Sequence, residues 1–161
     1  MLRIALLIAL LGADGRQEPR LRFFQSQQAP LLRSHYTLLI RPQDRPGALA
    51  ALLLEWPAGF DGRPLLESLR LCRMVAPPQT LRSRCVAVRP ARVERVGPRG
   101  WRILPEQPLA GEALHGLSLQ WFNPSRPGLY PLQLRATLTA APSDGPLPLG
   151  SWWIPIISDD D

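Results

Sequence analysis

Alternation of apolar and polar residues over the last third of the chain constrains the fold more than any other feature. From Leu117 to Trp121 every second residue is apolar, and a longer run with the same period extends from Tyr130 to Thr139. A period of two residues is typical of a β-strand with one buried face. A turn with two prolines, a glycine and the chain's only asparagine separates the runs. The simplest prediction is two antiparallel strands that pair as a hairpin through a wide loop.

Proline is the second constraint on the fold. The 161 residues include 19 prolines and 12 glycines, which suits short strands joined by turns and disfavours long helices. The predicted fold is all-β: a single-domain, loop-rich antiparallel β-sandwich with at most one or two short helices. The stretches 48–56 and 65–71 fit either a helix or a strand. Short strands are predicted at 36–40, at 85–96 as two pieces broken by Pro90 at a sheet edge, at 101–104 and at 151–157.

The chain is predicted to have four parts. Residues 1–13 have the pattern of a signal peptide, because Arg3 precedes an apolar run that ends at Leu11 and is far shorter than the roughly 20 residues of a membrane span. The alternative is a buried first strand or helix of a cytoplasmic protein. An extended arm at 14–34, the sandwich domain at 35–157 and an acidic tail at 158–161 follow. The N-terminal pattern favours export, and no later segment is long and apolar enough to span a membrane.

The two cysteines leave two interpretations open. A disulfide between Cys72 and Cys85 is permitted in an exported protein, where it would close a ring of about 14 residues and contribute roughly 3 kcal/mol of stability. Two unpaired buried thiols are the alternative. Two cysteines and two distant histidines do not have the spacing of a zinc site, and no motif indicates a metal or another cofactor.

Positive charge is concentrated in the middle of the chain. All the basic residues are arginines, the net charge is +6, and residues 63–102 hold ten arginines against two glutamates. This stretch predicts a surface for an anionic partner, such as an acidic protein, an envelope polyanion or an anionic lipid surface. A solvated face is the alternative. Nucleic acid is disfavoured because Trp101 is the only aromatic residue of the stretch. The arginines proposed for the surface are Arg82, Arg84, Arg89 and Arg92.

Trp153 is a candidate apolar contact. It falls on the opposite phase of its strand from Trp152, beside Pro155 and Ile157, so its indole is predicted to point outward. A second buried sheet face explains the same pattern equally well.

No residue pattern predicts catalysis. Neither His35 nor His115 lies in a recognisable motif, and no serine occupies a Gly-x-Ser-x-Gly turn. The sequence therefore favours a non-enzymatic structural or interaction module. A small envelope hydrolase that uses His115 with nearby carboxylates is the alternative.

The C-terminal third resembles a family of cyanobacterial exported proteins that is catalogued only as a domain of unknown function. The resemblance covers residues 105–157 and rests on Asn123-Pro124, Gly128-Leu129-Tyr130, the Thr-Ala-x-Pro-x-x-Gly stretch at 139–145 and Leu149-Gly150 before a final apolar strand. It implies an exported β-rich domain of the periplasm, thylakoid lumen or cell envelope, and it carries no activity. It also implies that the matched residues are structural turn formers: Asn123, Pro124, Gly128, Tyr130 and Gly150.

Overall fold

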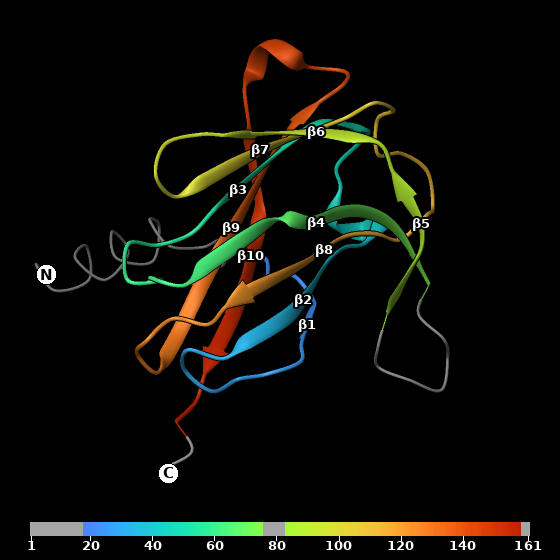
Figure 1. The fold of residues 1–161 in the computed structure, drawn as a ribbon. Helices are drawn as coiled ribbons and strands as arrows, with labels where there is room; N and C mark the ends of the chain where they lie inside the picture. The colour runs from blue at the N-terminus through green and yellow to red at the C-terminus, as the bar shows by residue number, and fades with distance from the viewer. Residues whose placement is uncertain (1–17, 76–82, 159–161) are drawn as a thin grey trace, which may run out of the picture.

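The protein is a sandwich of two antiparallel sheets. The computed structural model describes residues 18–75 and 83–158, and Figure 1 shows the sheets packed face to face. One sheet has the order β1-β2-β8-β4-β5 and the other the order β10-β9-β3-β7-β6. The elements are β1 (Phe23–Gln25), β2 (Arg33–Ile40), η1 (Pro42–Asp44), β3 (Leu49–Glu55), β4 (Arg63–Val75), β5 (Arg84–Arg89), β6 (Ala91–Arg95), β7 (Gly100–Pro105), β8 (His115–Phe122), β9 (Gly128–Leu138), η2 (Pro142–Asp144) and β10 (Leu147–Ile156).

These elements confirm the predicted all-β sandwich, with two short 3-10 helices and no longer helix among the described residues. The two stretches that fit helix or strand equally well are both strands, in β3 and β4. Sheet pairing outweighs the helix preference of their leucines and alanines, because each strand lies between two partners. The β5–β6 chain is broken at Pro90 as predicted, and both pieces are edge strands.

The core lies between the inner faces of the two sheets. Alternate side chains of β8 and β9 are fully buried there, as their period predicts. Trp121 is the centre of an aromatic cluster, with ring centroids 5.0 Å from Trp56, 5.1 Å from Phe60 and 5.8 Å from Trp101. Burial of these large rings supplies much of the hydrophobic stabilisation of the fold.

The predicted hairpin between residues 117–121 and 130–139 is wrong. β8 pairs with β2 and β4, whereas β9 pairs with β10 and β3 in the other sheet. The turn at Asn123 therefore carries the chain from one sheet across to the other. Both hydrogen-bonding edges of β8 are taken by strands from earlier in the chain, so its neighbour in sequence is not its neighbour in the sheet.

The arm predicted at 14–34 belongs to the sandwich from residue 18 onward. Its middle forms β1, and its last two residues begin β2. Its beginning runs parallel to β10 as an isolated bridge between Arg20 and Ser151. The amide of Ser151 donates to the carbonyl of Pro19 at 3.0 Å, and the amide of Leu21 donates to the carbonyl of Ser151 at 2.9 Å. The arm thus covers the β10 edge around Ser151, which shortens the exposed part of this sheet edge.

Gly150 lies in β10 where the arm pairs with this strand, and it is not the turn residue that the resemblance implies. It has φ +147° and lies at a register shift of β10. A Cβ atom there would approach the carbonyl oxygen of Pro19 to 2.4 Å. Glycine is needed because the arm lies directly on the backbone at this position.

Asn123 is buried and links the arm to the end of β8. Its side-chain amide donates to the carbonyls of Gln27 and Ala29, both at 2.9 Å, and its side-chain oxygen accepts a hydrogen bond from the Tyr36 hydroxyl. The residue is 1% exposed. Its role is structural, as expected, but it acts by bridging three segments and not by shaping a hairpin turn.

The other expected turn formers surround this link. Pro124 is buried, and its carbonyl accepts the amide of Leu31. Gly128 opens β9, and the Tyr130 hydroxyl donates to the carbonyl of Arg126 at 2.7 Å across the same turn. These contacts hold the crossing between the sheets in one shape.

Within the described ranges, no helix is long and apolar enough to cross a membrane. The segment predicted as a signal peptide, and the last three residues of the acidic tail, lie outside the described residues.

Candidate functional site

One side of the sandwich is formed by two consecutive edge strands. β5 is the last strand of its sheet, and β6 is the last strand of the other. The chain passes between them at Pro90, which cannot donate a ladder hydrogen bond and so separates the two pairings. Figure 1 shows β5 and β6 following each other around this side of the molecule. We call β5, β6 and the connection to the start of β7, residues 84–102, the Arg-rich edge.

The Arg-rich edge carries strong positive charge. Residues 84–102 contain six arginines and one carboxylate, Glu94. Glu94 forms ion pairs with Arg92 of β6 at 3.1 Å and with Arg102 of β7 at 3.7 Å, so it compensates two neighbours on adjacent strands. Among the described residues, Arg84, Arg95 and Arg99 form no ion pair and are exposed. The edge therefore presents uncompensated guanidinium groups to solvent.

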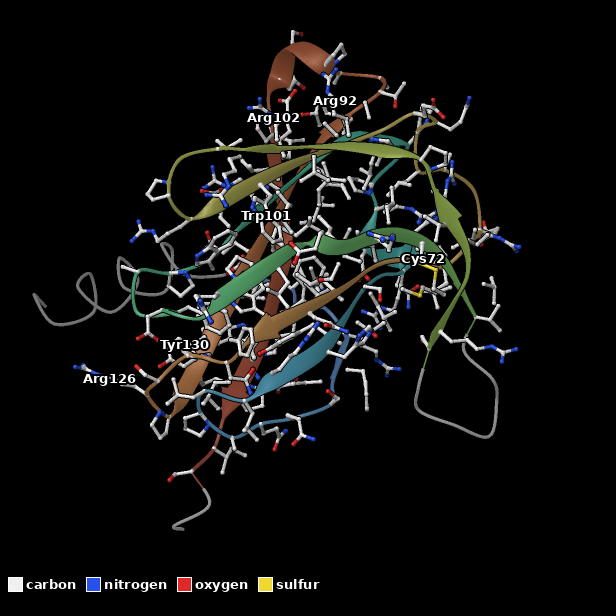
Figure 2. The ribbon with its side chains drawn as sticks, in the orientation of Figure 1. Cys72, Arg92, Trp101, Arg102, Arg126 and Tyr130 are labelled. Atoms are coloured by element: carbon white, nitrogen blue, oxygen red, sulfur yellow. A yellow bond between two sulfur atoms is a disulfide. The ribbon has the colours of Figure 1, made fainter. Side chains whose placement is uncertain are left out.

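The four arginines predicted as one surface are distributed over the two sheets. Arg84 and Arg89 lie in β5, whereas Arg92 lies in β6 of the other sheet. Figure 2 shows Arg92 and Arg102 together near β6, well away from Cys72. The guanidinium of Arg89 approaches the carbonyl of Gln107 at 3.5 Å. Arg82 lies outside the described residues.

Exposed valines interrupt the charge along β5. Val88 is 59% exposed and Val86 is 40% exposed, and Val75 of the neighbouring strand is also exposed. Val86 has no register partner in β4, because the pairing moves from Ala87 to Cys85 as β4 advances by one residue. This irregularity is a β-bulge, a common feature of edge strands.

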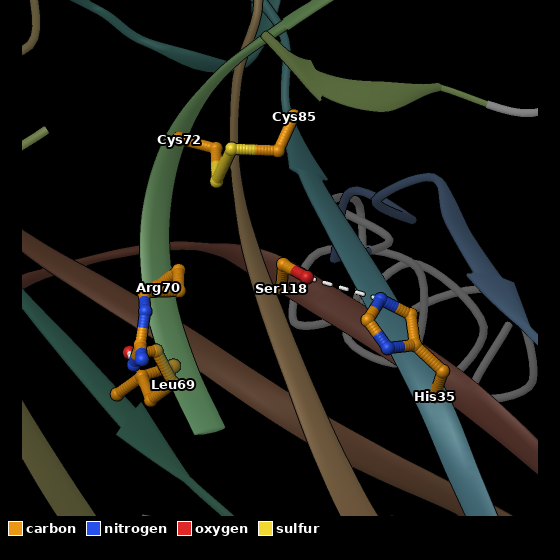
Figure 3. Close-up of a disulfide and its surroundings, with 6 residues drawn as sticks. All are labelled: His35, Leu69, Arg70, Cys72, Cys85 and Ser118. Atoms are coloured by element: carbon orange, nitrogen blue, oxygen red, sulfur yellow. Dashed lines mark hydrogen bonds between the residues drawn. A yellow bond between two sulfur atoms is a disulfide. The ribbon is translucent and has the colours of Figure 1, made fainter. Parts of the chain in front are cut away.

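The structure settles the two interpretations of the cysteines in favour of a disulfide. Cys72 of β4 and Cys85 of β5 are joined, with their Cα atoms 5.3 Å apart (Figure 3). Cys72 is fully buried, whereas Cys85 is exposed. β4 continues past Cys72 to Val75, and Cys85 lies in the next strand, β5. The crosslink therefore joins the edge strand β5 covalently to β4, an inner strand of the same sheet.

Trp153 lies on the outer face of its sheet, as its phase predicts, but the arm partly covers it. The guanidinium of Arg20 stacks over the indole at 5.6 Å from the ring centroid. Glu18, Pro19 and Arg20 line a shallow hollow with it. A cation–π contact and the adjoining arm account for the half-buried indole within the chain itself.

Near the Arg-rich edge, a hollow of about 480 Å³ opens where β3 ends and the β6–β7 turn begins. Trp56, Arg99, Pro131 and Gln133 are among the residues that line it. Its carboxylate, Glu55, lies 3.5 Å from the guanidinium of Arg135 and so is already paired. The hollow has no nucleophile beside a base, so it supports no catalytic arrangement.

His115 is not placed for catalysis. It is fully buried at the start of β8, and burial lowers the pKa of its imidazole to about 4, with the charges of Arg45 and Arg89 acting in the same direction. No carboxylate of the described residues contacts it. A neutral imidazole without access to solvent cannot exchange a proton with a substrate. The side chain is a buried core residue of the sheet.

We expect the stability of the protein to fall as the pH drops from about 6.5 to about 4. His115 has a lower pKa in the folded chain than in the unfolded chain, so the unfolded chain binds more protons in this window. The expected loss is roughly 3 kcal/mol. Urea unfolding across this range measures it. His115→Gln should show a shallower pH dependence, and an equal slope in both proteins would contradict the assignment.

A serine–histidine pair lies on the outer face of the sheet that contains β2 and β8, where the sequence did not indicate one. The hydroxyl of Ser118 in β8 is 3.0 Å from Nε2 of His35 in β2 (Figure 3). Partial burial lowers the pKa of His35. No carboxylate of the described residues bonds the imidazole, so no third group orients it as a base. The alternation over residues 117–121 placed Ser118 on an outer face, but the pairing of β2 with β8, which brings His35 beside it, was not predictable.

No metal site is present among residues 18–75 and 83–158. No three histidine, cysteine, aspartate or glutamate side chains gather there closely enough to hold an ion.

No protein-family profile matches the sequence, and no curated protein matches it at a significant level. The resemblance of the C-terminal third to cyanobacterial exported proteins therefore stays a prediction.

Proposed function

We propose that this protein is a non-enzymatic interaction module that binds an anionic partner through the Arg-rich edge. The observation that carries the proposal is the joining of two edge strands into one continuous side with six arginines and a single glutamate. A surface of one sign attracts ligands of the opposite sign and raises their rate of encounter.

The arrangement of the guanidinium groups supports recognition of carboxylates. Arg84, Arg95 and Arg99 are exposed and unpaired among the described residues, so they bind an incoming anion without first breaking an ion pair. A guanidinium offers a planar set of donors that matches a carboxylate or phosphate with two parallel hydrogen bonds. The only aromatic residue of the edge, Trp101, is 1% exposed, which leaves no stacking platform for bases.

The site chemistry supports a binding role over the hydrolase alternative. His115 is buried without a carboxylate, and the His35–Ser118 pair lacks an orienting acid among the described residues. A hydrolase that works through such groups needs a nucleophile, a base and an orienting acid in contact.

The disulfide supports the proposal that the protein is exported. Disulfides persist in oxidising compartments and are rare where thiols are kept reduced. The Cys72–Cys85 bond is consistent with such a compartment. Native protein whose two cysteines are alkylated without prior reduction would contradict this location.

Substitution of the edge arginines should weaken retention on immobilised polyglutamate. We expect the double variant Arg84→Gln/Arg95→Gln to bind about fivefold to thirtyfold more weakly, because each exposed pair contributes roughly 0.5–1 kcal/mol. The matched control is Arg22→Gln/Arg126→Gln, which removes the same charge from exposed positions outside the edge. The control should bind nearly as the parent protein does. Equal losses in the two variants would show that net charge alone drives retention and would contradict the proposal.

A further inference from the structure

We propose that β5 binds its partner by strand addition, in which an extended acidic segment of another protein pairs with the free edge of β5. This inference rests on the proposed function and specifies how the Arg-rich edge recognises its ligand. The added strand would place apolar side chains against Val86 and Val88 and carboxylates beside Arg84 and Arg89, at alternate positions.

The backbone of β5 has an unoccupied side. β5 pairs with β4 along one edge, and it is the terminal strand of its sheet. Among the described residues, no backbone hydrogen bond joins residues 84–89 to any segment other than β4. An edge strand of this kind presents a row of free amides and carbonyls that a second strand can satisfy.

The side chains of β5 select the kind of strand that can bind. Val88 and Val86 expose apolar surface, and Arg84 and Arg89 stand at the two ends of the strand. A second copy of β5 in antiparallel alignment would bring arginine against arginine, which is unfavourable. An acidic segment with alternating apolar residues can pack its apolar side chains against the valines and pair its carboxylates with the arginines.

The backbone edge also distinguishes among anionic partners. Lipid headgroups and simple polyanions would meet the arginines but could not supply the alternating donors and acceptors of a strand. A simple polyanion would also leave the apolar surface of the exposed valines in water. A polypeptide is the anionic partner that uses all three features of β5.

The disulfide restrains β5 in the extended conformation that strand pairing requires. It joins Cys85 of β5 to Cys72, a fully buried residue of β4. A strand that is already held in place loses less conformational entropy when a partner binds. The crosslink lies within the strand that would receive the ligand, where this preorganisation has the largest effect.

The test uses the full chain and three synthetic peptides in which glutamate and valine alternate. One peptide is unmodified, one carries backbone N-methyl groups on its glutamates and one carries them on its valines. Since the amides of alternate residues point to the same edge of a strand, only one methylated set can face β5. We expect one methylated peptide to lose at least about tenfold in affinity and the other to bind like the unmodified peptide. Hydrogen exchange of residues 84–89 should slow when the unmodified peptide binds.

The outcomes separate this inference from the proposed function. If both methylated peptides bind as the unmodified peptide does, strand addition is wrong, although Arg84→Gln/Arg95→Gln still weakens polyglutamate binding. Failure of the unmodified peptide to bind, with edge-dependent polyglutamate retention intact, also overturns strand addition alone. Loss of edge dependence in the polyglutamate experiment overturns both.

Discussion

Replacing Asn123 by aspartate is expected to lower the free energy of unfolding by about 3–4 kcal/mol. The side-chain amide of Asn123 donates to two carbonyls, those of Gln27 and Ala29, and the residue is buried. A carboxylate has no proton to donate, so it would place a buried negative charge against two carbonyl oxygens. Asn123→Ala is expected to cost less, about 2–3 kcal/mol, because it leaves unsatisfied groups without adding a charge.

The sign of the pH dependence shows whether a buried carboxylate causes the loss of stability in Asn123→Asp. Repulsion from the carbonyls and burial would raise the pKa of the new carboxyl in the folded chain above its unfolded value. Asn123→Asp should therefore regain stability relative to Asn123→Ala as the pH falls and lose it as the pH rises. Urea unfolding at several pH values measures this difference. Ser125→Ala, in the exposed part of the same turn, is the control and should cost no more than about 1 kcal/mol. A pH-independent difference between Asn123→Asp and Asn123→Ala would contradict the buried bridge.

Removal of the disulfide is the second large effect that we expect. The double variant Cys72→Ser/Cys85→Ser should lose about 3 kcal/mol, because the unfolded chain no longer contains a closed ring of this length. Reduced parent protein should show a similar loss. The loss of stability should also be largest in β5, since β4 is its only sheet neighbour among the described residues.

Equilibrium unfolding and hydrogen exchange measure the two parts of this prediction. Amides of β5 should exchange faster in the variant, whereas those of β9, in the middle of the other sheet, should change only with the global stability. An unchanged free energy of unfolding, with unchanged exchange in β5, would contradict the role of the crosslink.

Local chemistry made most strands predictable but not their partners. The two-residue period identified β8, β9 and β10, and Pro90 marked the break between β5 and β6. The period cannot say which strand lies beside which, because an apolar face fits any partner that buries it. The hairpin predicted across Asn123 failed for this reason, since β2 and β4 take both edges of β8.

The arginine content of the candidate site could be predicted from the sequence, but the surface on which these arginines lie could not. Counting arginines identified the basic stretch, and it placed Arg84, Arg89 and Arg92 together. The crossing at Pro90 puts them on two sheets, and Glu94 compensates only the β6–β7 part. The contact of His35 with Ser118 joins positions far apart in sequence and depended wholly on strand pairing.

The sequence by itself determined an all-β chain, its strand periodicity, its basic middle and the spacing that allows a disulfide. These properties follow from neighbouring residues, whose side chains alternate along an extended backbone. Only the tertiary structure decided that β5 and β6 form one exposed edge, that the arm covers the opposite edge at β10, and that Asn123 bridges buried segments. These features depend on which distant strands compete for each hydrogen-bonding edge, and that competition is resolved by packing of the whole core.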